Sequence, residues 1–297
     1  MSKKRKNAQK KSTTATALQS KTLEKNRSSS NSSEGRFDSF PLHLVQNNNY
    51  SGKDNSLELH ELWKGRVWVI PSFFSSKECR AWIDFCESFS SSEGQNGFQY
   101  TAHPASKYIT NRECYRLQQE NATELSKRIF DRLRDMKVRL NNQDDESNEI
   151  DDGGIIAHLQ KETADLYPLK RGLNSKNSGE YKPINCNPNI RVYRYDKGHA
   201  FGRHVDESNL VPGRGGGTTE MTMLIYLSTC QGGATRFHHP VGRGRRSSKS
   251  PSSFGFEPQV GALLLHVHGN HCLEHEADVV LDGQKYVLRT DLVYGDE

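Results

Sequence analysis

The sequence predicts a mainly β protein with flanking helices, in which short antiparallel strands curl into a double-sheet jelly roll of the cupin-like type. From residue 189 onward, apolar residues alternate with polar ones, which is typical of β-strands. Gly- and Pro-rich turns separate these segments, and a set of many short strands protects its edges by curling. Before residue 189, apolar residues recur at three- and four-residue steps, which indicates helices.

Composition predicts one large domain and a disordered segment. The chain has 297 residues, 33% hydrophobic content and a mean hydropathy of −0.83, which is too polar for two well-filled cores. We expect a disordered basic tail at 1–56, a helical support region of the catalytic domain at 57–188 and the β core at 189–297. Nine Lys and Arg residues precede Ser28, whereas Glu24 is the one acidic residue in the same stretch. The tail therefore supplies much of the net charge of +5.

The same composition predicts a soluble protein of the cytoplasm or nucleus. No stretch approaches the roughly 18 apolar residues of a membrane span, and the first residues are basic and polar, unlike a secretion signal. Six cysteines contain no CxxC pair, so we expect free thiols. The basic residues at 3–6 have two interpretations, a nuclear signal or a solvated tail.

In the support region we expect order from about Leu57, a short strand at 67–70 and two helices. Ser75 or Ser76 caps the first helix, which ends at the Ser- and Gly-rich segment 88–97. The second helix begins at Asn121 or Thr123, and surface connections follow at 141–152 and 170–188. Its apolar stripe comprises Leu125, Ile129, Leu133, Met136 and Leu140. In the β core, five strands are expected at 190–195, 221–227, 233–237, 262–267 and 285–294.

A candidate iron site begins with His204 and Asp206. The two residues are two apart, so on an extended strand their side chains project from the same face and can bind one metal ion. His275 precedes a strand-like run at 279–281, and a sheet that folds back could bring it beside the pair. Two imidazoles and one carboxylate leave positions open on the metal, as in non-haem Fe(II) oxygenases.

The histidine-rich segment 266–275 offers competing ligands. His271 and His275 have the i, i+4 spacing of a helical zinc pair, and Glu274 gives the HxxEH order. The segment has no amphipathic helix that could present this pair, and a zinc site there leaves His204 and Asp206 unexplained. The sequence therefore favours iron.

Several motifs carry a family resemblance in their order and spacing, and they cover much of the C-terminal half of the chain. Together they resemble the Fe(II)- and 2-oxoglutarate-dependent dioxygenases of the prolyl 4-hydroxylase type. Weaker similarity reaches the support region at 73–79 and at Asn111-Arg112. The motifs are Tyr195-Asp196-Lys197-Gly198, His204-Val205-Asp206, the segment 232–237, the segment 258–261, His275, and Gly283-Gln284-Lys285-Tyr286.

This resemblance implies a double-stranded β-helix in which His204, Asp206 and His275 hold Fe(II). It also implies 2-oxoglutarate and O2 as co-substrates, adds ascorbate as a candidate cofactor, and places Lys285 where the family binds 2-oxoglutarate. Tyr195 and Tyr226 would lend hydroxyls to the same co-substrate.

Arg289 is an equal candidate for the 2-oxoglutarate anchor. Lys285 and Arg289 share one face of the last predicted strand. The planar fork of an arginine also suits a carboxylate better than an ammonium does. Both residues therefore stay candidates.

We expect an enzyme that hydroxylates a protein side chain, with proline the leading candidate, and releases succinate and CO2. One alternative is a nucleic-acid-directed oxidative demethylase that uses the basic segment 242–249, but Gly and Ser, not stacking aromatics, interleave with its basic residues. Another is an inactive binding module, which would lack a metal ligand or an anion partner, and neither is missing. The segments 207–219 and 241–258 contain no readable docking motif, so the substrate itself is open.

Overall fold

The computed structural model describes residues 37–46, 56–89, 97–105, 110–140, 154–167, 181–212, 216–240 and 253–295. All of them belong to one compact unit, Gly35–Glu297. The first 36 residues of the predicted tail, the predicted acidic connection 141–152 and the basic segment 242–249 lie outside these ranges.

The described chain consists of many strands and a few helices. In chain order, its elements are η1 (Leu42–Leu44), β1 (Ser56–Trp63), β2 (Val67–Ile70), α1 (Ser76–Glu87), β3 (Gln99–His103), β4 (Arg112–Gln119), α2 (Thr123–Arg134), β5 (Lys137–Leu140), α3 (Gly154–Thr163), β6 (Lys182–Cys186), β7 (Ile190–Tyr195), β8 (Phe201–His204), β9 (Thr218–Tyr226), β10 (Cys230–Gly232), β11 (Thr235–His238), β12 (Ser253–Phe256), β13 (Leu263–Val267), η3 (Gly269–His271), β14 (His275–Ala277), β15 (Val280–Gly283) and β16 (Lys285–Gly295).

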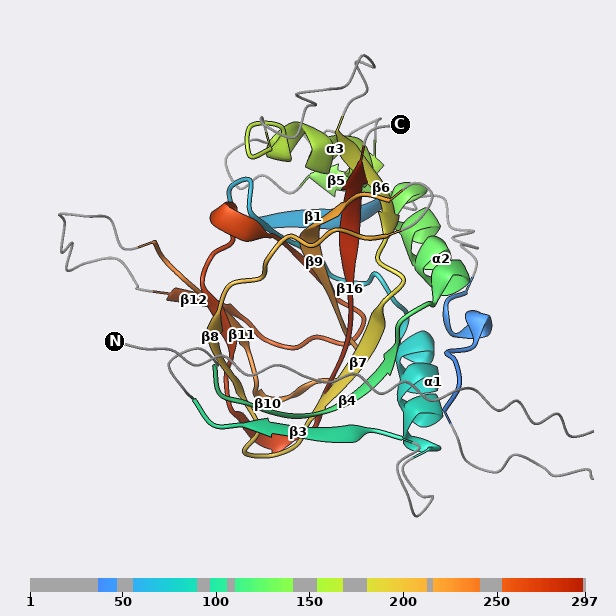
Figure 1. Ribbon diagram of the computed structural model, residues 1–297, viewed down its shortest axis with the longest axis vertical. Helices are drawn as coiled ribbons and strands as arrows, with labels where there is room; N and C mark the ends of the chain where they lie inside the picture. Colours follow the sequence, from blue (N-terminus) through green and yellow to red (C-terminus); the bar gives the residue numbers. More distant parts are fainter. Residues whose placement is uncertain are drawn as a thin grey trace, which may run out of the picture. The chain divides into compact units, whose positions relative to one another are not determined.

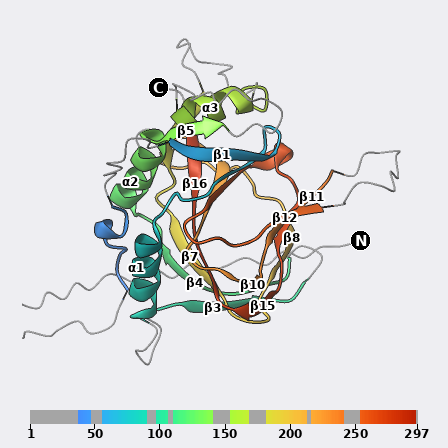
Figure 2. The same cartoon turned by 180° about the vertical axis from the view of Figure 1, so that it is seen from behind.

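One large sheet dominates the fold. Its strands follow the order β12-β11-β14-β8-β4-β7-β16-β9-β13-β2-β1-β5, with β3 added beside β4 and β6 beside β16. The sheet curls so that β8 and β11 stand opposite β7 and β16 (Figure 1). A separate β10-β15 pair lies at the end away from α3 and β5 (Figure 2). The predicted jelly-roll, double-stranded β-helix fold with flanking helices is confirmed.

Helices α1 and α2 cover the outer side of the sheet near β7 (Figure 1). Ser75 caps α1 as predicted: its hydroxyl accepts the backbone N–H of Glu78, whose carboxylate accepts the N–H of Ser75. Glu78 also forms a buried ion pair with Arg132 of α2, which ties the two helices together. No helix among the described residues is long and apolar enough to cross a membrane.

The predictions for the support region need three corrections. The second helix ends at Arg134 instead of reaching Leu140, because residues 137–140 pair with β1 as strand β5. The segment 182–186, predicted as part of a connection, pairs with β16 as β6. In both places strand pairing over long sequence separations overrides the local pattern.

The third correction is that the folded part begins before Leu57, inside the predicted tail 1–56. Phe40, Leu44 and Val45 are buried in the core, and the ring of Phe40 lies 5.2 Å from that of Trp82. The five strands predicted in the β core and the strand at 67–70 are confirmed, with ends shifted by a few residues at most.

Alternation along β16 and its neighbours separates a packed face from an open one. Tyr286, Leu288 and Leu292 pack into the core beneath the helices. Lys285, Val287 and Arg289 line a cavity on the inner side of the curled sheet. The period of two therefore places the cationic residues of β16 inside the cavity and its apolar residues against the helices.

Candidate metal centre

Strand pairing brings His204 and His275 together. Strands β8 and β14 are antiparallel neighbours, and His275 stands directly opposite His204 in their register. The two imidazole centroids are 4.3 Å apart. The fold-back expected from the sequence thus occurs through a direct ladder between two short strands.

Asp206 completes a group of three candidate ligands. It lies two residues beyond the end of β8, and the ligand atoms of His204, Asp206 and His275 all fall within 4.8 Å of one another. Oδ1 of Asp206 is 3.9 Å from Nε2 of His204, and Oδ2 is 3.8 Å from Nε2 of His275. Two nitrogens and one carboxylate therefore converge on one point, as an Fe(II) oxygenase site requires.

Backbone carbonyls orient both histidines. Nδ1 of His204 lies 2.8 Å from the oxygen of Gly202, and Nδ1 of His275 lies 2.9 Å from the oxygen of Leu273. When each Nδ1–H donates to its carbonyl, the lone pair of each Nε2 is directed at Asp206 and is free for a metal ion.

Burial keeps the candidate ligands in the protonation states that metal binding needs. It lowers the pKa of His204 to about 4, with the nearby His275 as a second cause, and it also lowers the pKa of His275. Burial alone would raise the pKa of Asp206, but the charge of Arg289, together with His266, His275 and His268, outweighs it and holds that pKa well below the usual range. Neutral imidazoles and an ionised carboxylate are the ligating forms.

Asp206 is also fixed by its neighbours. Thr222 on β9 donates its hydroxyl to Oδ2 of Asp206 at 2.6 Å, and a guanidinium nitrogen of Arg289 lies 3.0 Å from the same oxygen. Arg289 also pairs with Asp291 at 3.3 Å. The positive charge of Arg289 is therefore balanced by two carboxylates in this structure.

Lys285 is in a different situation from Arg289. Its side chain is buried in the same cavity, and Nζ donates to the backbone oxygen of Gly233 at 2.6 Å. It forms no ion pair with a carboxylate among the described residues. Burial lowers its pKa to about 8. Of the two candidate anchors, Lys285 is the one whose charge an incoming anion could balance.

The rings of the two predicted tyrosines lie near this ammonium. Nζ of Lys285 is 5.5 Å from the ring centroid of Tyr195 and 5.6 Å from that of Tyr226. Tyr195 lines the cavity, whereas Tyr226 is fully buried and its hydroxyl pairs with Thr235 at 2.7 Å. The structure places both rings near Lys285, and of the two tyrosines Tyr195 lines the cavity.

Some residues near the centre carry no distinct sequence signal. Thr222 is one of several polar residues on β9, and Arg112 belongs to β4, a strand that the sequence does not predict. The guanidinium of Arg112 lies over the rings of Tyr193 and Phe201 at 4.6 and 4.5 Å, and Phe201 stacks on His204. The HxxEH alternative fails as expected, because its residues form a short 3-10 turn and a strand instead of one helix.

Among known proteins, similarity appears only at the level of structure. The scan against protein-family models found no match, and neither did the search of curated proteins. The fold is similar to a viral collagen prolyl hydroxylase from Paramecium bursaria Chlorella virus-1 in complex with 2-oxoglutarate, at 15% identity over 76% of this chain and 94% of that one, with a TM-score of 0.38.

Two further prolyl hydroxylases are similar to the same extent. The prolyl-4-hydroxylase of Pseudomonas putida matches at 13% identity over 76% of this chain and 92% of that one, with a TM-score of 0.43. The enzyme of Trichoplax adhaerens, in complex with a hypoxia inducible factor peptide fragment, matches at 13% identity over 77% and 84%, also with a TM-score of 0.43. The chain is thus similar in structure to prolyl hydroxylases and related 2-oxoglutarate-Fe(II) oxygenases.

Proposed function

We propose that this protein is an Fe(II)- and 2-oxoglutarate-dependent dioxygenase. The observation that carries the proposal is the convergence of His204, Asp206 and His275 in a cavity that also contains a buried lysine without a carboxylate partner among the described residues. The three side chains would hold Fe(II), which when bound supplies the activation of O2.

The remaining roles follow from the surroundings of each side chain. Lys285 would pair with the far carboxylate of 2-oxoglutarate, since its ammonium donates to a backbone oxygen and forms no ion pair among the described residues, and Tyr195 would line the same subsite. Arg289 and Thr222 would keep Asp206 ionised and correctly oriented. None of these residues needs to act as a general base, because the oxidation is chemistry of the bound cofactor.

The first experiment is anaerobic addition of Fe(II) and then 2-oxoglutarate to the purified protein. We expect the visible charge-transfer band of the chelate in the wild type and its loss in His275→Ala. His271→Ala is the matched control, because this histidine is close in sequence but lies outside the ligand group. A folded wild-type protein without the band would contradict the proposal.

For the substrate we propose a protein side chain, with proline the leading candidate. The support is the resemblance of the ordered motifs from Tyr195 to Tyr286 to prolyl 4-hydroxylases. The assay measures succinate released from 2-oxoglutarate in the presence of proline-containing peptides, with and without ascorbate. Peptides in which proline is replaced by alanine should fail to stimulate succinate release.

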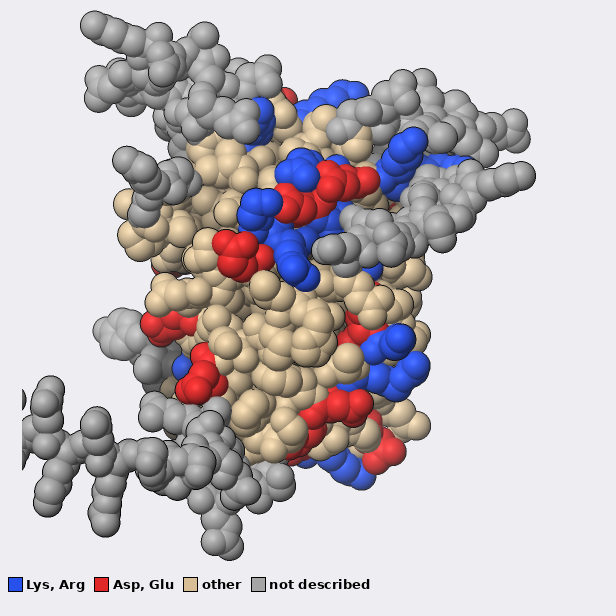
Figure 3. Space-filling model, turned by 90° about the vertical axis from the view of Figure 1, so that its right-hand side faces the viewer, with Lys and Arg blue, Asp and Glu red and all other residues tan. Residues whose placement is uncertain are grey.

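A nucleic-acid substrate has less support. On the face that carries α1 and α2, Lys and Arg side chains stand beside Asp and Glu and form no continuous basic track among the described residues (Figure 3). Stimulation of succinate release by oligonucleotides, with strong dependence on salt, would favour this alternative over a peptide substrate.

A further inference from the structure

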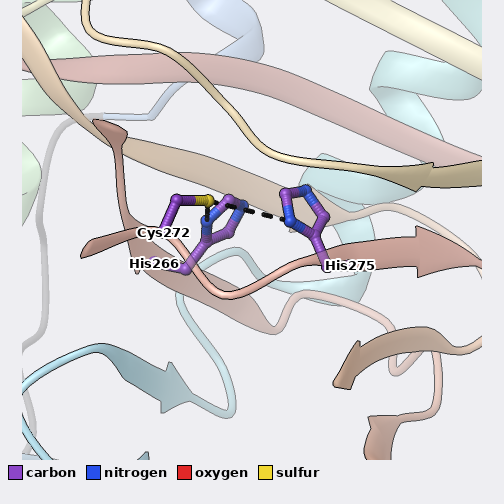
Figure 4. Close-up of side chains that lie close together, drawn as sticks. All are labelled: His266, Cys272 and His275. Atoms are coloured by element: carbon purple, nitrogen blue, oxygen red, sulfur yellow. Dashed lines mark hydrogen bonds between the residues drawn. The ribbon is translucent and has the colours of Figure 1, made fainter. Parts of the chain in front are cut away.

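A second set of metal-binding side chains shares His275 with the candidate iron centre. His266 on β13, Cys272 after η3 and His275 offer ligand atoms that all lie within 4.8 Å of one another. Sγ of Cys272 is 4.0 Å from Nδ1 of His266 and 3.9 Å from Nδ1 of His275, so the sulfur is about equally far from the two nitrogens (Figure 4). Bonds of about 2.3 Å to sulfur and about 2.0 Å to nitrogen place tetrahedral zinc ligands about 3.5 Å apart, close to this spacing.

His266 lacks the partners that a structural histidine in a core has. It is 1% exposed, and among the described residues its Nε2 has no hydrogen-bond partner. Its Nδ1 has only a 3.4 Å contact with the backbone oxygen of Val267 and the distant thiol. A buried imidazole with such weak bonding is costly unless it binds something else.

The ring of His266 suits metal binding through Nδ1, whose contact with Val267 is long at 3.4 Å, and in His275 the metal would replace the 2.9 Å contact of Nδ1 with the oxygen of Leu273. With the metal on Nδ1, the proton of each ring sits on Nε2. That nitrogen faces Oδ2 of Asp206, at 3.5 Å in His266 and 3.8 Å in His275. Histidines that bind a metal commonly donate their other N–H to a carboxylate, which fixes the tautomer. Asp206 would thus change from a ligand of the iron site to a hydrogen-bond acceptor for this second site.

We propose that His266, Cys272 and His275 form a second metal site, selective for Zn²⁺ or a similar borderline-soft divalent ion, with water at the fourth position. A thiolate ligand favours such an ion over Fe(II), and the thiol loses its proton when it coordinates. A neutral imidazole has one lone pair, so His275 can serve the His204 and Asp206 pair or this site, but not both. Zinc would therefore exclude iron from the neighbouring centre.

Co²⁺ is the probe for this site, because a thiolate ligand gives cobalt a charge-transfer band in the near ultraviolet. The experiment titrates the metal-free full-length protein with Co²⁺ in the absence of oxygen. We expect the band in the wild type and in His204→Ala, which changes only the iron ligands. It should vanish in Cys272→Ser and stay in the matched control Cys230→Ser, another partly buried free thiol. One equivalent of Zn²⁺ should remove the band by displacement.

His266→Gln provides a second test that leaves the thiol in place. It should weaken Co²⁺ binding through the thiolate by about tenfold or more. The proposal is overturned if folded wild-type protein shows no thiolate band, if Cys272→Ser keeps it, or if His266→Gln binds like the wild type. The readout is independent of the proposed activity, so a protein that lacks the Fe(II)-2-oxoglutarate band can still show this one.

Discussion

The proposed role of Lys285 predicts how 2-oxoglutarate affinity depends on pH. Burial lowers the pKa of this ammonium to about 8, so a rise in pH removes the charge that would bind the far carboxylate. If binding requires protonated Lys285, the apparent Kd for 2-oxoglutarate increases as the fraction of protein molecules with protonated Lys285 decreases. From about pH 7 to about pH 9 this fraction falls from about nine tenths to about a tenth, and affinity should fall about tenfold, or about 1.4 kcal/mol.

The histidines of the cavity and Tyr195 should not titrate in this interval. The pKa values of His204, His266 and His275 are lowered by burial, away from it, and burial raises the pKa of Tyr195 beyond it. The carboxylates of 2-oxoglutarate are ionised throughout. Tyr193 also lines the cavity, and although burial would raise its pKa, the charges of Arg191 and Arg112 lower it, so a comparison with a Lys285 variant is needed to assign the loss of affinity to Lys285.

The assay is anaerobic titration of the Fe(II)-loaded protein with 2-oxoglutarate at several pH values, followed by the visible band. Lys285→Arg is the control, because an arginine keeps its charge over this range, and its profile should be flat. Lys285→Ala should bind weakly at every pH. A flat profile in the wild type, or a tenfold slope that persists in Lys285→Arg, would refute the assignment of Lys285 as the anchor.

Three further predictions concern the hydrogen bond to Asp206, the ion pair between α1 and α2, and the close approach of Gly261 to Phe74. Thr222→Val removes the hydroxyl that donates to Asp206 and should lower Fe(II) affinity, measured by iron titration, by about 10- to 100-fold. The control Thr290→Val removes a hydrogen bond to Asn187 and should leave Fe(II) affinity unchanged. Arg132→Ala leaves Glu78 buried without its ion-pair partner and should lower the free energy of unfolding in urea by about 3–5 kcal/mol. The control Arg134→Ala removes an exposed ion pair and should lower it by less than about 1 kcal/mol. Equal losses in the two variants would contradict this expectation. Gly261→Ala places a Cβ 2.0 Å from the backbone oxygen of Phe74, at a residue whose φ is +82°. The control Gly198→Ala shares the positive φ, but its Cβ would meet open space. In thermal unfolding, Gly261→Ala should therefore destabilise the protein clearly more than Gly198→Ala.

Apolar alternation was sufficient to predict the β core but not the strands that build the site. Strands β7, β9, β13 and β16 carry enough buried residues to be recognised locally. By contrast, β8 and β14 are four and three residues long and rich in polar side chains, so their strand structure depends on pairing with each other and with β4 and β11. The pairing of β8 with β14 places His204 opposite His275.

The choice between Lys285 and Arg289 was likewise beyond the sequence. The two residues share a face of β16, and alternation treats them alike. What separates them is the position of Asp206, which follows β8 and is distant in sequence, yet lies 3.0 Å from the guanidinium. Local patterns predict which face of a strand a side chain occupies, but not which charged side chain from a distant part of the sequence lies beside it.

The contacts of Thr222 and Arg289 explain how Asp206 could serve as a one-oxygen ligand. Thr222 and Arg289 both bind Oδ2, whereas Oδ1 faces His204 at 3.9 Å. With Oδ2 held in this way, Oδ1 is the oxygen left for a metal ion, so the carboxylate would occupy one coordination position and leave the others to a co-substrate. Because Arg289 balances the charge of Asp206, Lys285, four residues away on the same face, can remain available for the incoming anion.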